Sequence, residues 1–250
     1  MLAGWQKHMV RLCLRRKGRR SPRSYSRLKQ SSSFDDLELF GKGQVPMNFD
    51  LSLHTLKIEM TPLVGMAIEF FDQTPVRDLL VPRFAGTGVY ALYYLGEHEL
   101  YLPLTALNQE KCTHPIYVGK AVPTGRRTGR TMGSQGTQLY SRLRQHSNSI
   151  THASDLGIDD FRCRFMILSD AMTDLIVPVE SELVRRYSPL WNSRIDGFGN
   201  HDPGSGRYDQ APSEWDTVHP GRPWVERLRG EPPSLEVVKA KARASLRELS

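Results

Sequence analysis

Two tyrosines of the chain lie inside short apolar runs that are flanked by glycine. Gly88 comes just before Tyr90, and Gly119 comes just after Tyr117. Runs rich in β-branched and aromatic residues predict strands, so the two phenols can meet across a small sheet with backbone close by. Taken alone, each tyrosine is more typical of packing.

An arginine and a histidine follow on a predicted helix over residues 137–147. Arg142 and His146 are four positions apart, so they share one helix face and can contact the same ligand or neighbouring group. Leu139 and Leu143 pack beside them. The guanidinium is always charged, and an imidazole can titrate near neutral pH. A solvated surface pair is the other interpretation of this spacing.

One glutamate differs from its neighbours on a second predicted helix, residues 179–187. Glu180 borders the apolar stripe of that helix, whereas Glu182 faces away. A carboxylate beside an apolar stripe must be paired, protonated or bound to a metal. The geometry therefore favours Glu180 over Glu182, although Pro178 restricts how far upstream regular helix can extend.

In chain order these residues resemble the signature of the GIY-YIG nuclease superfamily. The matching elements are Gly88-Val89-Tyr90, Tyr117-Val118-Gly119-Lys120, Arg142 with His146, Glu180 and Asn192. Valine replaces isoleucine in both name-giving triplets, and the 26 residues between the two tyrosines exceed the spacer of minimal modules, which suggests an extra hairpin or recognition loop. The downstream run over residues 193–228 further resembles type II restriction endonucleases that cut the palindrome CCGCGG.

The resemblance implies an α+β fold, with a small antiparallel three-stranded sheet flanked by helices, inserted loops and extensions at both ends. It implies hydrolysis of double-stranded DNA with one divalent metal ion held by Glu180. This ion is Mg²⁺, for which Mn²⁺ can substitute. The implied catalytic residues are Tyr90, Tyr117, Arg142, His146, Glu180 and Asn192.

Each of these residues has a role that the resemblance implies. Arg142 stabilises the charge of the transition state. Tyr90, with its pKa lowered by metal-bound phosphate and by neighbours, relays a proton from the attacking water to His146, and either residue could be the general base. Tyr117 orients water or phosphate, Lys120 screens phosphate, and Asn192 fixes the site through hydrogen bonds.

The net charge of +7 is unevenly distributed along the chain. Residues 1–34 carry ten bases and no acid, so residues 35–250 have 24 bases against 27 acids. Within that acidic body, residues 111–154 carry seven bases and no acid, a footprint that suits a phosphate backbone or a solvated basic face. The candidate DNA-binding residues are Lys120, Arg126, Arg127, Arg130 and Arg144, with the polar loop over residues 200–207 as a further candidate for base recognition.

Four segments are expected: a disordered basic tail (1–34), a framing segment (35–80), the nuclease domain (81–230) and a C-terminal helix (231–250). Other interpretations of the tail, as a transit peptide or as sequence upstream of a true start at Met47, stay open. Further predicted elements are a helix that begins near Thr61 and Pro62, strands at residues 89–95, 115–119 and 161–168, a return strand at 100–104, and loop over most of 193–224. The terminal helix has Leu235, Val238 and Leu246 on one face, for a dimer contact or for packing on its own domain.

Several classes of protein are disfavoured. No stretch approaches the roughly 18 apolar residues of a membrane span, so we expect a cytoplasmic protein, and the resemblance to restriction endonucleases implies a bacterial one. Three cysteines without short spacings disfavour a disulfide framework and a cysteine-rich zinc site.

Cleavage of a palindrome would suit a homodimer and a companion DNA methyltransferase that acts on the same site. A GIY-YIG nuclease of repair or mobile-element type, which acts on branched or nicked DNA, is the alternative function.

Overall fold

The computed structural model describes residues 61–123 and 136–249, which belong to a unit over Ile58–Ser250. The basic tail, Met47 and three of the candidate DNA-binding residues, Arg126, Arg127 and Arg130, lie outside the described residues.

An antiparallel sheet forms the centre of this unit. Its strands are β1 (Arg77–Asp78), β2 (Gly88–Tyr94), β3 (Tyr117–Ala121) and β4 (Phe161–Ile167), in the order β1-β4-β2-β3. The three longer strands confirm the predicted three-stranded sheet, and β1 is a two-residue addition that the sequence pattern does not indicate. The register places Tyr90 opposite Gly119 on β3 and opposite Phe165 on β4.

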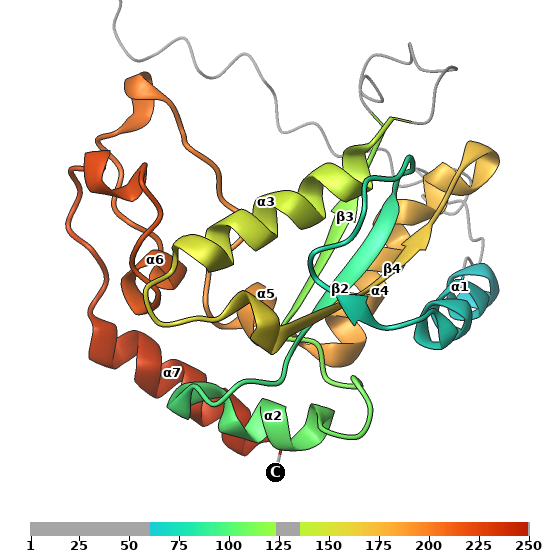
Figure 1. Cartoon of the computed structure of the whole chain (residues 1–250), viewed down its shortest axis with the longest axis horizontal. Coiled ribbons are helices and arrows are strands. Elements are labelled where there is room, and N and C mark those ends of the chain that lie inside the picture. Colours follow the sequence, from blue (N-terminus) through green and yellow to red (C-terminus); the bar gives the residue numbers. More distant parts are fainter. Residues whose placement is uncertain (1–60, 124–135, 250) are drawn as a thin grey trace, which may run out of the picture. The chain divides into compact units, whose positions relative to one another are not determined.

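Helices cover both faces of the sheet, which makes the fold α+β with two apolar cores (Figure 1). Helix α3 (Gln138–His152) covers one face, and α1 (Thr61–Gln73) and α4 (Ile176–Tyr187) cover the other. Because alternate residues of a strand face opposite sides, Tyr90 belongs to the α3 core and Val89 to the α4 core. All of β2 is therefore buried.

The predicted return strand at residues 100–104 is wrong. The chain forms a 3-10 turn, η3 (Glu99–Tyr101), and then α2 (Leu102–Asn108). Pro103 lies in the first turn of α2, where its fixed φ suits a helix and its missing N–H costs nothing, whereas a strand would lose a ladder hydrogen bond there.

Three helices of the described chain follow α4 in its C-terminal part. They are α5 (Leu190–Ser193), α6 (Glu214–Val218) and α7 (Leu235–Arg247), and the 3-10 turns of the described chain after α3 are η5 (Ile158–Asp160), η6 (Asp170–Leu175), η7 (Ser205–Arg207) and η8 (Val225–Arg227). The predicted loop thus contains α6, which begins at a capping box between Ser213 and Asp216.

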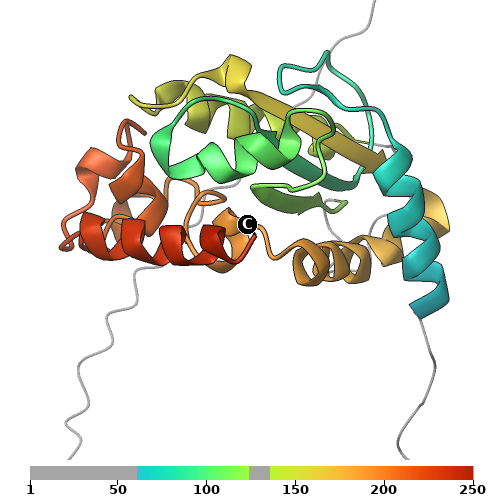
Figure 2. The ribbon, with the colours of Figure 1, turned by 90° about the horizontal axis from the view of Figure 1, so that it is seen from below.

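Helix α7 packs against the same unit, next to α2 and α6 (Figure 2). Val238, Ala242 and Leu246 are buried in the α3 core, whereas Leu235 is 38% exposed. The apolar face of α7 is therefore used within its own domain, which is one of the two alternatives that the sequence left open. Among the described helices, none has the length and apolar character needed to cross a bilayer.

Candidate active site

Four of the predicted catalytic side chains gather on the α3 face of the sheet. The Tyr90 hydroxyl lies 2.6 Å from Nε2 of His146, and its ring centroid lies 6.3 Å from that of Tyr117. The Tyr117 ring meets His146 edge to face at 5.0 Å. The charge of Arg142 also acts on the Tyr90 phenol, whose pKa it lowers. The predicted meeting of the two tyrosines and the shared direction of Arg142 and His146 are both present in the structure.

Two glycines make this arrangement possible. A Cβ on Gly119 would lie 2.4 Å from the Tyr90 hydroxyl, so only glycine leaves room for that phenol. Gly88 has a φ of +153° and a Cβ there would lie 1.9 Å from the carbonyl oxygen of Met166, so this position also requires glycine. The glycines beside the tyrosines therefore act sterically.

Burial controls the electrostatics of the Tyr90–His146 pair. Desolvation, followed by the charges of Arg142, His201 and Arg222, lowers the pKa of His146 well below its usual value. The imidazole is therefore neutral near pH 7 and able to accept a proton through Nε2.

The expectation that neighbours lower the pKa of Tyr90 is wrong for this structure. Burial and the nearby Tyr117 raise the pKa of Tyr90 well above its usual value, and the opposing effect of Arg142 is smaller. Burial also raises the pKa of Tyr117. Both phenols are therefore protonated near pH 7, so Tyr90 can donate to Nε2 of His146 when the imidazole carries its proton on Nδ1.

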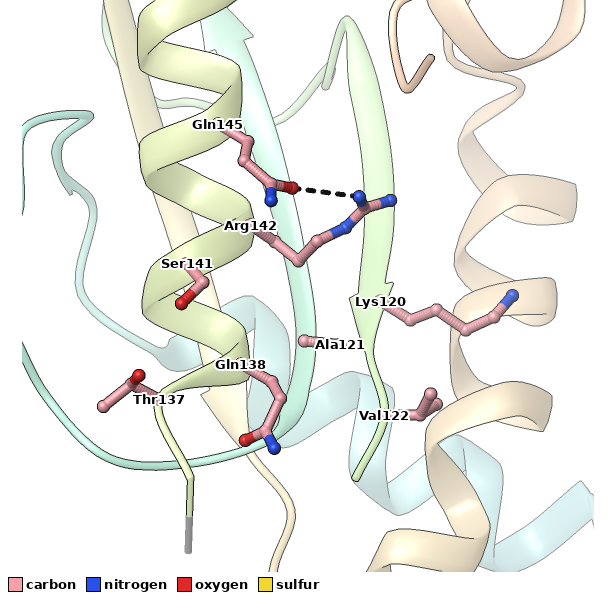
Figure 3. Close-up of a pocket in the computed structure, with 8 residues that line it drawn as sticks. All are labelled: Lys120, Ala121, Val122, Thr137, Gln138, Ser141, Arg142 and Gln145. Atoms are coloured by element: carbon pink, nitrogen blue, oxygen red, sulfur yellow. Dashed lines mark hydrogen bonds between the residues drawn. The ribbon is translucent and has the colours of Figure 1, made fainter. Parts of the chain in front are cut away.

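Arg142 lines a polar cleft of about 600 Å³ between the end of β3 and the start of α3 (Figure 3). Its guanidinium reaches from α3 toward β3 and donates to Oε1 of Gln145 at 3.1 Å and to Nε2 of His201. The remaining residues that line the cleft are Lys120, Ala121, Val122, Thr137, Gln138 and Ser141. A permanent cation at the wall of an open cleft is suited to meeting a phosphate.

Glu180 and Lys120 lie on the other side of β3. Lys120 points away from Arg142 toward α4, and its Nζ lies 2.7 Å from Oε2 of Glu180. The Glu180 side chain is 17% exposed beside buried Val179 and Leu183, as the helix geometry predicts, whereas Glu182 pairs with Arg185. The carboxylate of Glu180 still acts on Tyr117, whose pKa it helps to raise. The two groups of side chains therefore adjoin across strand β3.

Asn192 holds that strand in place. Its Oδ1 accepts from the Val118 N–H at 2.7 Å and its Nδ2 donates to the Val118 carbonyl at 2.8 Å. The side-chain amide thus pairs with β3 as a neighbouring strand would, on the edge that β2 does not cover. Because Val118 lies between Tyr117 and Gly119, this clamp fixes both residues that shape the site.

A family model described as the Eco29kI GIY-YIG domain matches residues 82–246. The chain belongs to this family. It is therefore a GIY-YIG endonuclease of restriction type, and its substrate is DNA. No curated protein compared with the chain matches it.

GIY-YIG nucleases typically use a divalent metal, and Glu180 suits one. Mg²⁺ takes one or two carboxylates and completes its shell with water and substrate phosphate. In the structure the Glu180 carboxylate has a cationic partner, the Lys120 ammonium at 2.7 Å. The donor chemistry therefore fits a hard divalent ion at Glu180.

A separate cluster contains His98, Asp155 and His219, whose ligand atoms lie within 4.8 Å of one another. Asp155 accepts from both imidazoles, at 3.3 Å from His98 and 2.9 Å from His219. The second nitrogens of the two rings take part in hydrogen bonds with the Leu100 N–H and the Tyr101 hydroxyl. An imidazole that accepts at one nitrogen carries its proton on the other, so these hydrogen bonds favour a polar network over a metal site.

The structure shows further contacts that the spacing of residues did not indicate. Phe198 stacks on His146 with ring centroids 4.5 Å apart, and His201 meets Arg142. Both residues lie in the glycine- and proline-rich segment after α5. That segment has no helical or strand periodicity from which the direction of a side chain could be predicted. Arg144 is not part of this group, because it lines a second cleft with Tyr140 and Asn148.

Proposed function

We propose that this protein is a type II restriction endonuclease that cuts double-stranded DNA at a palindrome, CCGCGG, with one Mg²⁺ per active site. The observation that carries the proposal is the convergence on β3 of Tyr90, Tyr117, His146, Arg142 and Glu180 in a chain of this family. In this proposal, all six predicted catalytic residues, Asn192 included, serve phosphodiester hydrolysis.

The proton transfers follow from the Tyr90–His146 hydrogen bond. As water attacks phosphorus, Tyr90 takes a proton from the water and passes its own to Nε2 of His146. The new bond joins phosphorus to the water oxygen, and the bond from phosphorus to the 3′ oxygen breaks with its electron pair on that oxygen, which then takes a proton from solvent. The products are a 5′ phosphate and a 3′ hydroxyl. His146 is thus the final base. Tyr90 needs no lowered pKa, because it receives one proton while it gives up another and so never becomes a free phenolate.

Charge stabilisation comes from three side chains. Arg142 donates to the phosphate oxygens in the transition state, where a planar cation held by Gln145 costs little reorganisation. Glu180 would hold a divalent ion, which would supply positive charge at the scissile phosphate. Lys120 moves from Glu180 toward the phosphate when DNA enters, and Tyr117 orients the water.

Recognition of a palindrome favours a two-fold homodimer with one active site for each strand. The basic residues Lys120, Arg126, Arg127, Arg130 and Arg144 contact DNA, and the loop over residues 200–207 contributes to base recognition. A restriction role further requires a methyltransferase that protects the same site in the bacterial cytoplasm, as a companion and not as a stable subunit.

Sequencing the ends of cleaved DNA tests this proposal. Purified protein is incubated with phage DNA and Mg²⁺, with a chelator as control, and the fragment ends are sequenced. We expect discrete fragments that all end within CCGCGG, carry 5′ phosphates and disappear with the chelator. Ends at random positions, or cutting confined to branched or nicked DNA, would contradict the proposal and favour a repair-type nuclease.

A further inference from the structure

Arg222 is a buried arginine in the C-terminal extension, only 3% exposed. Its Nε donates to Asp216 at 2.6 Å in an ion pair whose two side chains are 2% and 1% exposed. The guanidinium also lies 4.6 Å from the ring of Trp215 and 4.8 Å from the ring of Trp224. A charge buried at this depth is costly unless every donor is used, so its partners indicate what it holds in place.

Three further hydrogen bonds of Arg222 go to one loop. Nη1 donates to the carbonyls of Phe198 and Asn200, both at 3.2 Å, and Nη2 donates to the carbonyl of Gly197 at 3.1 Å. These residues leave α5 and carry no regular secondary structure of their own. One planar side chain therefore fixes the backbone of residues 197–200, as a lysine could not.

This loop, residues 197–201, forms a wall of the active site. Phe198 is 1% exposed and stacks on His146 with an angle of 17° between the rings. The next side chain to reach the site is His201, whose Nε2 accepts from Nη1 of Arg142. His201 and Gln145 therefore both accept from Nη1 of Arg142, and neither uses its Nη2 or Nε.

We propose that the 197–201 loop is a positioning element for the reaction, in which Arg222 fixes the loop, Phe198 orients His146 and His201 orients Arg142. The inference rests on the proposed function, because it assigns an effect on phosphodiester hydrolysis. None of the three residues touches the reacting atoms. They act through Arg142 and His146.

His201 gives the sharper test because its side chain lies at the surface, so its substitution is compatible with folding. His201→Ala removes the acceptor for Arg142, and we expect kcat to fall about 10- to 100-fold with KM changed less than about threefold. His201→Gln supplies an amide oxygen and should recover most of the lost kcat. His152→Ala, an exposed histidine on the C-terminal turn of α3, is the matched control and should cleave as the wild type does.

Arg222→Lys tests the other half of the proposal through the pH profile of kcat. The titratable groups that face His146 are Tyr90, Tyr117, Arg142, His201 and Arg222. Lysine keeps the charge but releases the loop, so water reaches His146 and the acidic limb of the profile moves toward pH 6.5. A variant that merely lost folded protein would lower kcat equally at every pH.

The outcomes separate this inference from the proposed function. If the wild type does not cleave DNA, the proposed function fails. If the wild type cleaves and His201→Ala matches it, or if His201→Gln is as slow as His201→Ala, the assignment of His201 is overturned. An Arg222→Lys variant that folds and keeps the wild-type pH profile would overturn the role of the clamp.

Discussion

The imidazole of His146 illustrates how burial sets the chemistry of a single side chain. It is 2% exposed and faces two guanidiniums, so its charged form is disfavoured and its neutral form is left to accept from Tyr90. The same burial raises the pKa of Tyr90, so proton transfer between them depends on their hydrogen bond and not on an ionised phenol. Sequence spacing could pair Arg142 with His146, but it could not show how deeply His146 and Tyr90 are buried.

The lowered pKa of His146 predicts how stability depends on pH. Its pKa is lower in the folded than in the unfolded state, so below about pH 6.5 the unfolded chain binds the extra proton and the free energy of unfolding falls. We expect His146→Gln, which keeps an acceptor near Tyr90, to lose less stability than the wild type between pH 7.5 and pH 5.5. Urea unfolding of both proteins at the two pH values measures this difference. Equal losses would show that His146 is not held neutral by the fold.

At the level of secondary structure, the site depends on an edge strand held from both sides. β2 pairs with one edge of β3, and Asn192 binds the Val118 backbone on the other. Tyr117 and Lys120 then face opposite sides of the strand, toward α3 and α4, because strand side chains alternate. A ligand at this edge can therefore meet residues from both helices.

Helix α7 offers a matched pair of valines that tests its packing. Val238 is 1% exposed and Val237 is 66% exposed, so they are adjacent residues with opposite burial. Val238→Ala should lower the free energy of unfolding by about 2 kcal/mol through lost apolar burial and a cavity. Val237→Ala should change it by less than about 0.5 kcal/mol. Urea unfolding measures both values, and equal effects would mean that this face of α7 is not buried in the domain.

Local patterns predict those elements whose residues carry a period. The alternation of Phe161 and Cys163 with Arg162 and Arg164 predicts β4, and the glycine-flanked tyrosine runs predict β2 and β3. The helical spacing of Arg142 and His146 likewise places them correctly on α3. The apolar residues at 100–104 gave a wrong strand prediction, because Leu and Tyr occur in helices as well as in strands. Pro103 favours the helix, since it lies in the first turn of α2.

Long-range contacts could not be predicted from such patterns. Arg222 binds a loop more than twenty positions earlier, through backbone carbonyls that any residue type would offer. Phe198 and His201 owe their places to that clamp. The part of the site that lies on regular elements was therefore readable from the sequence, and the part that lies on the C-terminal loop was not.

For the whole molecule, the net positive charge and the nuclease domain lie in different parts of the chain. The overall charge of +7 derives from residues 1–34, whereas residues 35–250 carry more acids than bases. DNA would therefore be attracted locally, by Arg142, Lys120 and the basic residues of 111–154, and not by the net charge of the nuclease domain. Binding through such a patch weakens as the salt concentration rises, because the release of condensed counterions into a more concentrated solution gains less free energy.

Two glutamates of one helix test directly the proposal that Glu180 holds a catalytic divalent ion. Glu180→Gln removes a charge at the site, whereas Glu182→Gln removes a charge that pairs with Arg185 away from it. The measurement is the rate of phage DNA cleavage at increasing Mg²⁺ for the wild type and both variants. We expect at least about a hundredfold loss for Glu180→Gln with DNA binding retained, and wild-type rates for Glu182→Gln. Wild-type cleavage by Glu180→Gln at every Mg²⁺ concentration would contradict the account.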